Sequence, residues 1–215
     1  MLYHQLCPEA QERARDNYRR SAEEDEWWDS DYEHWKEKLD DLGFADADIK
    51  FSGFSCQGDG ASFTACITRE FKIPDVLVTR LEDATQVARV LLRFNGKHGA
   101  PDLSWSINGK IQRSTSARYV HANTIYANLE LENGGDVPED LANDLKAWVT
   151  AEENSLTSEA RGLSNEIYRC LESSWDEINC DESVAQNIIE LKIDFDKEGT
   201  PTCSKIQFLD FEQYG

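Results

Sequence analysis

The chain has 215 residues, enough for one large domain or two small ones with a buried core. Its 42 Asp and Glu against 22 Lys and Arg give a formal charge of −20, which argues against direct contact with nucleic-acid phosphates or anionic lipids and favours a basic partner. No apolar run approaches the roughly 20 residues that span a bilayer, and the N-terminus lacks the pattern of a secretory signal, so we expect a cytoplasmic protein.

The first expected elements are two helices. Pro8 and Glu9 suit the first turn of a helix, whose apolar positions recur every four residues at Leu6, Ala10, Ala14 and Tyr18. A second helix carries a wider apolar stripe, and Gly43 is placed to end it in the left-handed conformation. That stripe consists of Trp28, Tyr32, Trp35, Leu39 and Leu42. We expect the two helices to pack as an antiparallel pair.

A β-hairpin is predicted next, because the apolar period changes from about four to two. Ile49 and Phe51 alternate with polar residues, and the alternation resumes at Phe63 after a Gly-Asp-Gly turn centred on Asp59. Helical spacing returns over residues 83–94. Aromatic and β-branched residues then predict strands over 103–107 and 118–132.

Residues 133–137 form the clearest linker, and Pro138 restarts a helix. We expect a long helical stretch with interruptions, a shorter helix over 184–189, and strands over 190–195 and 205–211. The fold class is therefore α+β, with an antiparallel sheet against which an N-terminal helical pair and a longer C-terminal helical segment pack. One domain over 1–215 is expected, with a sub-boundary at 133–137 between 1–132 and 138–215.

No catalytic or metal-binding pattern is found in the sequence, so we predict neither an enzyme nor a cofactor. The six Cys form no Cys-x-x-Cys pair, and the four His have no ligand spacing. The segment 53–57 begins like a hydrolase nucleophile elbow, but Gln57 replaces the closing glycine. The segment from Asp194 copies half of a calcium loop, yet Lys205 stands where position 12 needs a glutamate.

The segment 51–63, FSGFSCQGDGASF, resembles a family of poorly characterised bacteriophage proteins that carry an SGF-x-x-QGDGASF block. The helix over 6–18 followed by the Asp-Glu-Trp-Trp run that ends at Trp28 resembles the same proteins, as does 181–195 more loosely. Cys56 departs from the pattern, where we expect a serine, and 69–160 lies outside the resemblance. The resemblance implies that the protein is encoded by a phage and is located in the cytoplasm of the host cell. Such proteins are sometimes labelled antitoxins, and small acidic phage proteins most often disarm host defences.

The Gly-Asp-Gly turn leaves two interpretations open. A glycine-flanked aspartate is ordinary turn chemistry, which makes Asp59 structural. The two glycines also let a ligand or partner approach the backbone, with Gln57, Asp59 and Ser62 supplying polar contacts.

Acidic residues concentrate toward both ends of the chain, with formal charges of −9 over 1–48, +2 over 49–135 and −13 over 136–215. Such runs commonly form a solvated face, but two dense clusters are more easily explained by a basic groove that receives them. Trp27 lies off the apolar stripe and is a candidate anchor for a partner. The first cluster comprises Glu23, Glu24, Asp25, Glu26, Asp29, Asp31 and Glu33, and the second comprises Glu172, Asp176, Glu177, Asp181 and Glu182.

The leading hypothesis is a phage-encoded inhibitor of the anti-CRISPR or anti-restriction type. Its carboxylates would mimic nucleic acid and pair with the Lys and Arg of a basic groove in a host protein or nucleoprotein complex. One alternative is an antitoxin-like protein that neutralises a specific partner through the 57–62 hairpin. Another is a small-molecule-binding protein in which Gln57 and Asp59 line a pocket.

Overall fold

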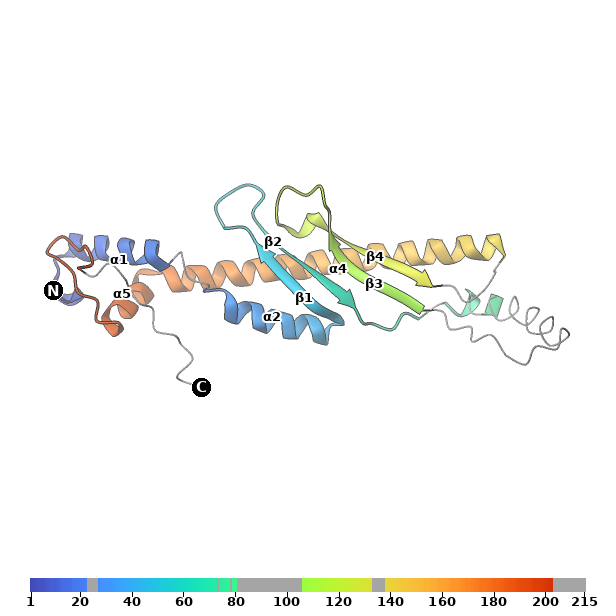
Figure 1. Cartoon of the computed structure of the whole chain (residues 1–215), viewed down its shortest axis with the longest axis horizontal. Coiled ribbons are helices and arrows are strands. Elements are labelled where there is room, and N and C mark those ends of the chain that lie inside the picture. The colour runs from blue at the N-terminus through green and yellow to red at the C-terminus, as the bar shows by residue number, and fades with distance from the viewer. Residues whose placement is uncertain (23–26, 73, 78, 81–105, 133–137, 203–215) are drawn as a thin grey trace. The chain divides into compact units, whose positions relative to one another are not determined.

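The computed structural model describes residues 1–22, 27–72, 74–77, 79–80, 106–132 and 138–202 (Figure 1). The chain divides into two compact units. Unit 1 comprises Met1–Asp31 and Cys170–Gly215, and unit 2 comprises Tyr32–Arg169. Helices and an antiparallel sheet make the α+β class, as the sequence predicts.

Unit 2 is built on a four-stranded antiparallel sheet in the order β1-β2-β3-β4 (Figure 1). The strands are β1 (Phe44–Phe51), β2 (Ala61–Ile67), β3 (Ser106–Arg113) and β4 (Ile125–Glu132). Alternate residues face the core, so that Ile49, Phe63 and Ile111 are buried. Lys50, Lys110 and Tyr126 lie at the alternating positions and are exposed on the opposite face of the sheet. The predicted hairpin is confirmed, with Phe51 opposite Ala61 at its closed end.

The helix α4 (Glu139–Asn179) covers the free edge of β4 with its polar side chains. The backbone N–H of Ala127 donates to Thr157 Oγ1 at 2.9 Å, and that of Leu129 donates to Glu153 Oε1 at 2.9 Å. These bonds satisfy edge groups that would otherwise be open to pairing with another strand. Apolar positions of the same helix are buried: Leu141, Leu145, Val149, Leu156, Ala160, Leu163 and Ile167.

The helix α2 (Asp29–Asp41) is followed by Gly43, which has the left-handed φ of 81° that the sequence predicts. Arg69 stabilises the region where α2 is followed by the sheet. Its guanidinium forms a bidentate pair with Glu159, with N–O distances of 2.6 and 2.7 Å, and lies 4.5 Å from the centre of the Phe44 ring. One arginine thus joins the end of the sheet to α4 by a charge-assisted pair and a cation–π contact.

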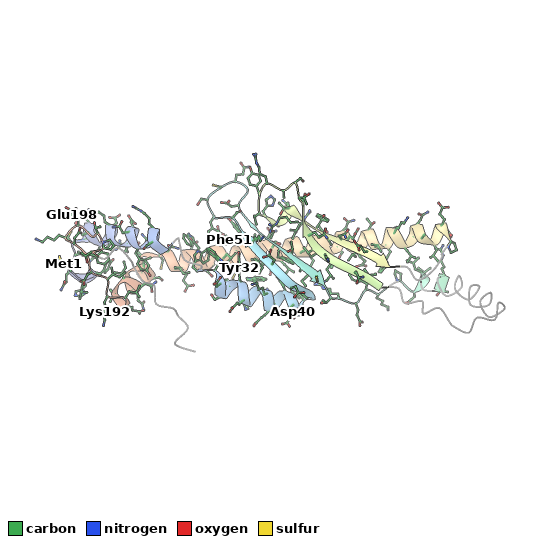
Figure 2. All side chains as sticks on the ribbon, viewed as in Figure 1. Met1, Tyr32, Asp40, Phe51, Lys192 and Glu198 are labelled. Carbon is green, nitrogen blue, oxygen red and sulfur yellow. The ribbon has the colours of Figure 1, made fainter. Side chains whose placement is uncertain are left out.

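Unit 1 has its own apolar core, in which α1 (Pro8–Ala22) packs against α5 (Asp181–Glu190) and the short helix η1 (Tyr3–Gln5). The apolar stripe predicted for the first helix is confirmed, because all four of its members are buried. The core consists of Tyr3, Leu6, Ala10, Ala14, Tyr18, Val184, Ile188 and Phe195. Met1, labelled in Figure 2, is tied to this core because its amino group donates to the carbonyl of Phe195 at 2.7 Å.

Several sequence-based expectations differ from the structure. The α4 helix is continuous rather than interrupted, and the strand predicted over 118–132 begins only at Ile125. Residues 190–195 form no strand: α5 ends at Glu190, Lys192 adopts a left-handed φ of 52°, and Phe195 makes a single bridge to Pro201.

Other expectations remain predictions. Residues 83–94, 103–105, 133–137 and 205–211 lie outside the described residues, so the linker and the helix and strands expected there are untested. The expected packing of the first two helices would join the two units, and it stays a prediction, as does the single domain over 1–215.

Candidate interaction surfaces

The two acidic clusters of the sequence fall mainly in unit 1. Its residues include 20 Asp and Glu against 7 Lys and Arg, a formal charge of −13, whereas unit 2 carries 22 against 15, or −7. Unit 1 is the smaller of the two, with 31 residues from the N-terminal segment and 46 from the C-terminal segment. The acidity of the two chain ends is therefore concentrated in one compact body.

Two side-chain contacts bring the clusters together. The ring centres of Trp27 and Trp175 lie 5.2 Å apart, and the thiol of Cys170 lies 3.8 Å from Asp31 Oδ1. Trp28 adds an edge-to-face contact with Trp27 at 5.6 Å. Asp29 and Asp31 of the first cluster thus lie beside the last turns of α4, which carry Glu172, Asp176 and Glu177 of the second cluster. We call this region, defined by residues 27–31 and 170–177, the acidic end.

The carboxylates of the acidic end are open to solvent. Asp29, Glu172, Asp176 and Glu177 are exposed, while Asp31 is half-buried. None of the four exposed groups forms an ion pair within the described ranges. Of the other predicted contact residues, Glu33 is exposed on α2 in unit 2, and Glu23, Glu24, Asp25 and Glu26 lie outside the described residues.

Three of the four arginines of α1 use their guanidinium groups elsewhere in unit 1. Arg13 donates to the carbonyl of Glu198 at 2.7 Å, and Arg15 and Arg19 both pair with Asp181. Asp181 is thereby removed from the set of unpaired acids, although the sequence places it in the second cluster. The exposed charge of the acidic end is consequently left uncompensated by these three bases.

The pairing of Asp181 predicts a pH dependence for unit 1. The hydrogen bond from Arg19, together with the charge of Arg15, lowers the pKa of Asp181. A carboxyl whose pKa is lower in the folded state stabilises that state above its unfolded pKa, near pH 4, and loses this contribution as the pH falls through the folded value. We expect Asp181→Asn to flatten the acid limb of unfolding monitored by hydrogen exchange in α1. An acid limb identical to that of the unmodified protein would contradict this role.

The second predicted site is the loop between β1 and β2, which adjoins the loop after β3 (Figure 1). We call residues 52–60 and 114–121 together the crown. Asp59 Oδ2 accepts hydrogen bonds from the backbone N–H groups of Ser55 at 2.9 Å and Cys56 at 2.6 Å. The carboxylate therefore holds its own loop together, which favours the turn interpretation of Asp59, while its contact with a partner stays a prediction.

Glycines of the crown permit close packing between its two loops. Gly58 has a φ of 105° and lies against Tyr119, and a Cβ at Gly60 would lie 2.4 Å from His121 Cβ. Below the crown, Phe51 forms an edge-to-face pair with Tyr32 at 6.4 Å, and both are labelled in Figure 2. Most of the 51–63 block is thus explained by folding. The exposed residues of the crown include Cys56 and Gln57 and, from the neighbouring loop, Tyr119.

Sequence reasoning missed Trp175 and Tyr119 as candidate contact residues. Trp175 belongs to the apolar repeat of a helix, which indicates core packing, yet it is only half-buried. Tyr119 has an exposed fraction of 53% and lies in a segment interpreted as a strand. No sequence signal separates these two aromatic residues from their buried counterparts.

Comparison with known proteins identifies a family model that matches most of the chain. The family model described as "Domain of unknown function (DUF8835)" matches residues 27–181. The chain belongs to this family. The match includes the acidic end, the sheet and the crown, and it omits α1 and nearly all of α5. No curated protein and no solved structure matches the chain.

Two kinds of feature are missing from the part of the chain that the structure describes. No helix there is both long and apolar enough to cross a membrane. No group of three or more His, Cys, Asp and Glu side chains in those ranges is arranged to hold a metal ion.

Proposed function

We propose that the protein binds a basic macromolecule through the acidic end, and that it does so without catalysis. The observation that supports this proposal is the contact between Trp27 and Trp175, since it gathers unpaired carboxylates from two distant segments around half-buried aromatic rings. Aromatic residues are common anchors of interfaces, and the surrounding charge steers a basic partner and speeds its association.

The partner in this proposal is a host-defence protein or nucleoprotein with a positively charged nucleic-acid groove. Carboxylates of the acidic end pair there with Lys and Arg that otherwise hold phosphates. The resemblance of the 51–63 block to phage proteins supports a counter-defence role of the anti-CRISPR or anti-restriction type. Competition for the groove accounts for inhibition without any enzymatic step.

A matched pair of triple variants tests the proposal. Glu172→Gln/Asp176→Asn/Glu177→Gln removes three charges from the acidic end, and Glu37→Gln/Asp40→Asn/Asp41→Asn removes three exposed charges from α2 in unit 2. At about 0.5 kcal/mol for each exposed pair, the first variant should bind about tenfold more weakly. The readout is phage plating on hosts that each carry one defence system, followed by titration of the purified target complex.

The control variant should protect phage as well as the unmodified protein does, and its affinity should show the same decrease with rising salt. Equal effects of the two triple variants would count against a localised surface. A complex that survives molar salt unchanged would contradict an electrostatic mechanism altogether.

A second candidate is an antitoxin-like protein that neutralises one partner through the crown. The observation in its favour is the exposure of Cys56 and Gln57 on a loop that Asp59 holds together, next to the loop that carries the exposed Tyr119. Gln57→Ala with Tyr119→Ala should abolish activity in this case, whereas the triple variant of the acidic end should retain it.

A further inference from the structure

We infer that Arg113 binds the phosphate group of a small ligand, together with Ser62 and Lys50. Arg113 is the last residue of β3 and directly precedes the second loop of the crown. All three residues belong to unit 2, whereas the acidic end belongs to unit 1. The inference therefore goes beyond the proposed function and does not depend on it.

The first step is the unpaired charge of Arg113. Its guanidinium is half-buried, and its one hydrogen bond within the described residues runs from Nη2 to Ser62 Oγ at 2.9 Å. The buried Nε of the same side chain has no partner there. The five other half-buried arginines of the described ranges differ, because they pair with carboxylates or donate to backbone carbonyls: Arg15, Arg19, Arg69 and Arg80 do the former, and Arg161 the latter.

The second step is the energetic consequence of this difference. A half-buried cation loses part of its hydration, and a hydroxyl group cannot replace that hydration as an anion can. The chain carries 42 Asp and Glu, yet none of those that the structure describes forms an ion pair with Arg113. An arginine that served the fold alone would gain stability from such a pair, as Arg69 does from Glu159. The arrangement of Arg113 thus suits an anion that comes from outside the chain.

The third step is the set of donors beside the guanidinium. Ser62 is fully buried, and Lys50 lies directly opposite it in the register of β1 and β2, so both side chains are on the same face of the sheet. Lys50 is exposed, and its Nζ lies 3.4 Å from Asp48 Oδ2. An exposed pair of this kind contributes little stability, so the ammonium can turn to a ligand. A guanidinium, a hydroxyl and an ammonium group together match the several acceptor oxygens of a phosphate.

The fourth step selects a small ligand over a nucleic-acid strand. A protein with a formal charge of −20 repels a polyanion along its whole length. A single phosphate group responds mainly to charges within a Debye length, about 8 Å at physiological ionic strength. The site lies in the part of the sequence, residues 49–135, that carries a formal charge of +2. Asp59, the acid of the adjoining loop, already accepts two backbone hydrogen bonds.

The test uses the full chain and three probes at constant ionic strength: inorganic phosphate, adenosine monophosphate and a short oligothymidylate. Nitrogen-15 NMR follows the Nε–H signal of Arg113, which the Arg113→Lys variant assigns, and calorimetry measures the affinities. We expect phosphate and adenosine monophosphate to shift this signal and the oligonucleotide to bind more weakly than the mononucleotide. Arg113→Gln should weaken binding of the mononucleotide about tenfold or more, the effect of one charge-assisted hydrogen bond.

Two further variants provide the controls. Arg118→Gln removes the same charge from an exposed arginine of the crown and should change the affinity by less than Arg113→Gln does. Lys50→Gln alters an exposed side chain, so it should weaken binding without disturbing the fold. If Arg113→Gln unfolds unit 2, Lys50→Gln and Arg118→Gln decide between a local site and a general effect of charge.

An Arg113 signal that neither phosphate nor adenosine monophosphate moves would overturn the inference. Equal losses of affinity in the Arg113→Gln, Lys50→Gln and Arg118→Gln variants would also contradict it, since they would indicate attraction by net charge alone. Tighter binding of the oligonucleotide through Arg113 would replace the small ligand by a nucleic-acid strand and so refute the choice made here. None of these results bears on the acidic end, whose residues all three variants leave unchanged.

Discussion

Replacing Gly199 by alanine should lower the free energy of unfolding of unit 1 by about 3 kcal/mol. Gly199 has a left-handed φ of 86°, which costs an L-residue about 1 to 2 kcal/mol. A Cβ there would lie 2.2 Å from the carbonyl oxygen of Ala10, a backbone atom that cannot turn away. Both penalties arise where Gly199 meets Ala10 of α1. Hydrogen exchange of α1 and α5, with a denaturant titration, measures the loss.

Two further substitutions separate the causes. Asn tolerates a left-handed φ better than Ala does, so Gly199→Asn should be as damaging as Gly199→Ala only if the contact with Ala10 dominates. Gly162 lies on the exposed side of α4, where a Cβ would meet no atom of the described residues within 4 Å, and Gly162→Ala should stabilise the helix by about 0.5 to 1 kcal/mol. A Gly199→Ala protein as stable as the unmodified chain would show that the turn can move away from α1.

The core of unit 1 shows what the sequence can and cannot predict. The stripe from Leu6 to Tyr18 is recognisable because a four-residue apolar repeat has a local cause, the pitch of the helix. Its partner, α5, lies more than 150 residues away in the chain, and an apolar stripe carries no information about which other stripe covers it. Element type is therefore predictable here, whereas helix pairing is not.

The segment after α5 misleads for a physical reason. Leu191, Ile193 and Phe195 alternate with polar residues as strand residues do. All three contribute to the core of unit 1, but Lys192 adopts a left-handed conformation and the chain does not extend. A period of two thus reports that alternate side chains are buried, and it does not by itself report a neighbouring strand to pair with.

The acidic end is only half predictable. Its carboxylates are visible as charge clusters in the sequence, because density of one residue type is a local property. The contact between Trp27 and Trp175 is not visible in the sequence, because it joins positions 148 residues apart and depends on the path of α4. The sequence likewise does not show whether Asp181 is exposed to solvent or paired with Arg15 and Arg19, because the pairing depends on how α1 packs against α5.

Gly60→Ala should separate the two loops of the crown and lower the stability of unit 2 by about 1 to 3 kcal/mol. The new Cβ would lie 2.4 Å from His121 Cβ and 2.9 Å from His121 Cα, and the second of these is a backbone atom. Ser52 Oγ, which donates to the carbonyl of Val120 at 3.2 Å, would lose its partner as the loops move apart. Hydrogen exchange over 52–60 and 114–121 should rise together.

Gly162→Ala again serves as the matched control, since it adds the same methyl group to unit 2 away from the other described atoms.

The effect of Gly60→Ala on binding affinity then distinguishes the two candidate functions. If the acidic end is the binding surface, Gly60→Ala should weaken folding of unit 2 but leave the affinity of the folded protein unchanged. If the crown is the binding surface, the affinity of the folded protein should fall because the loops are separated. That result would favour binding through the crown over binding through the acidic end.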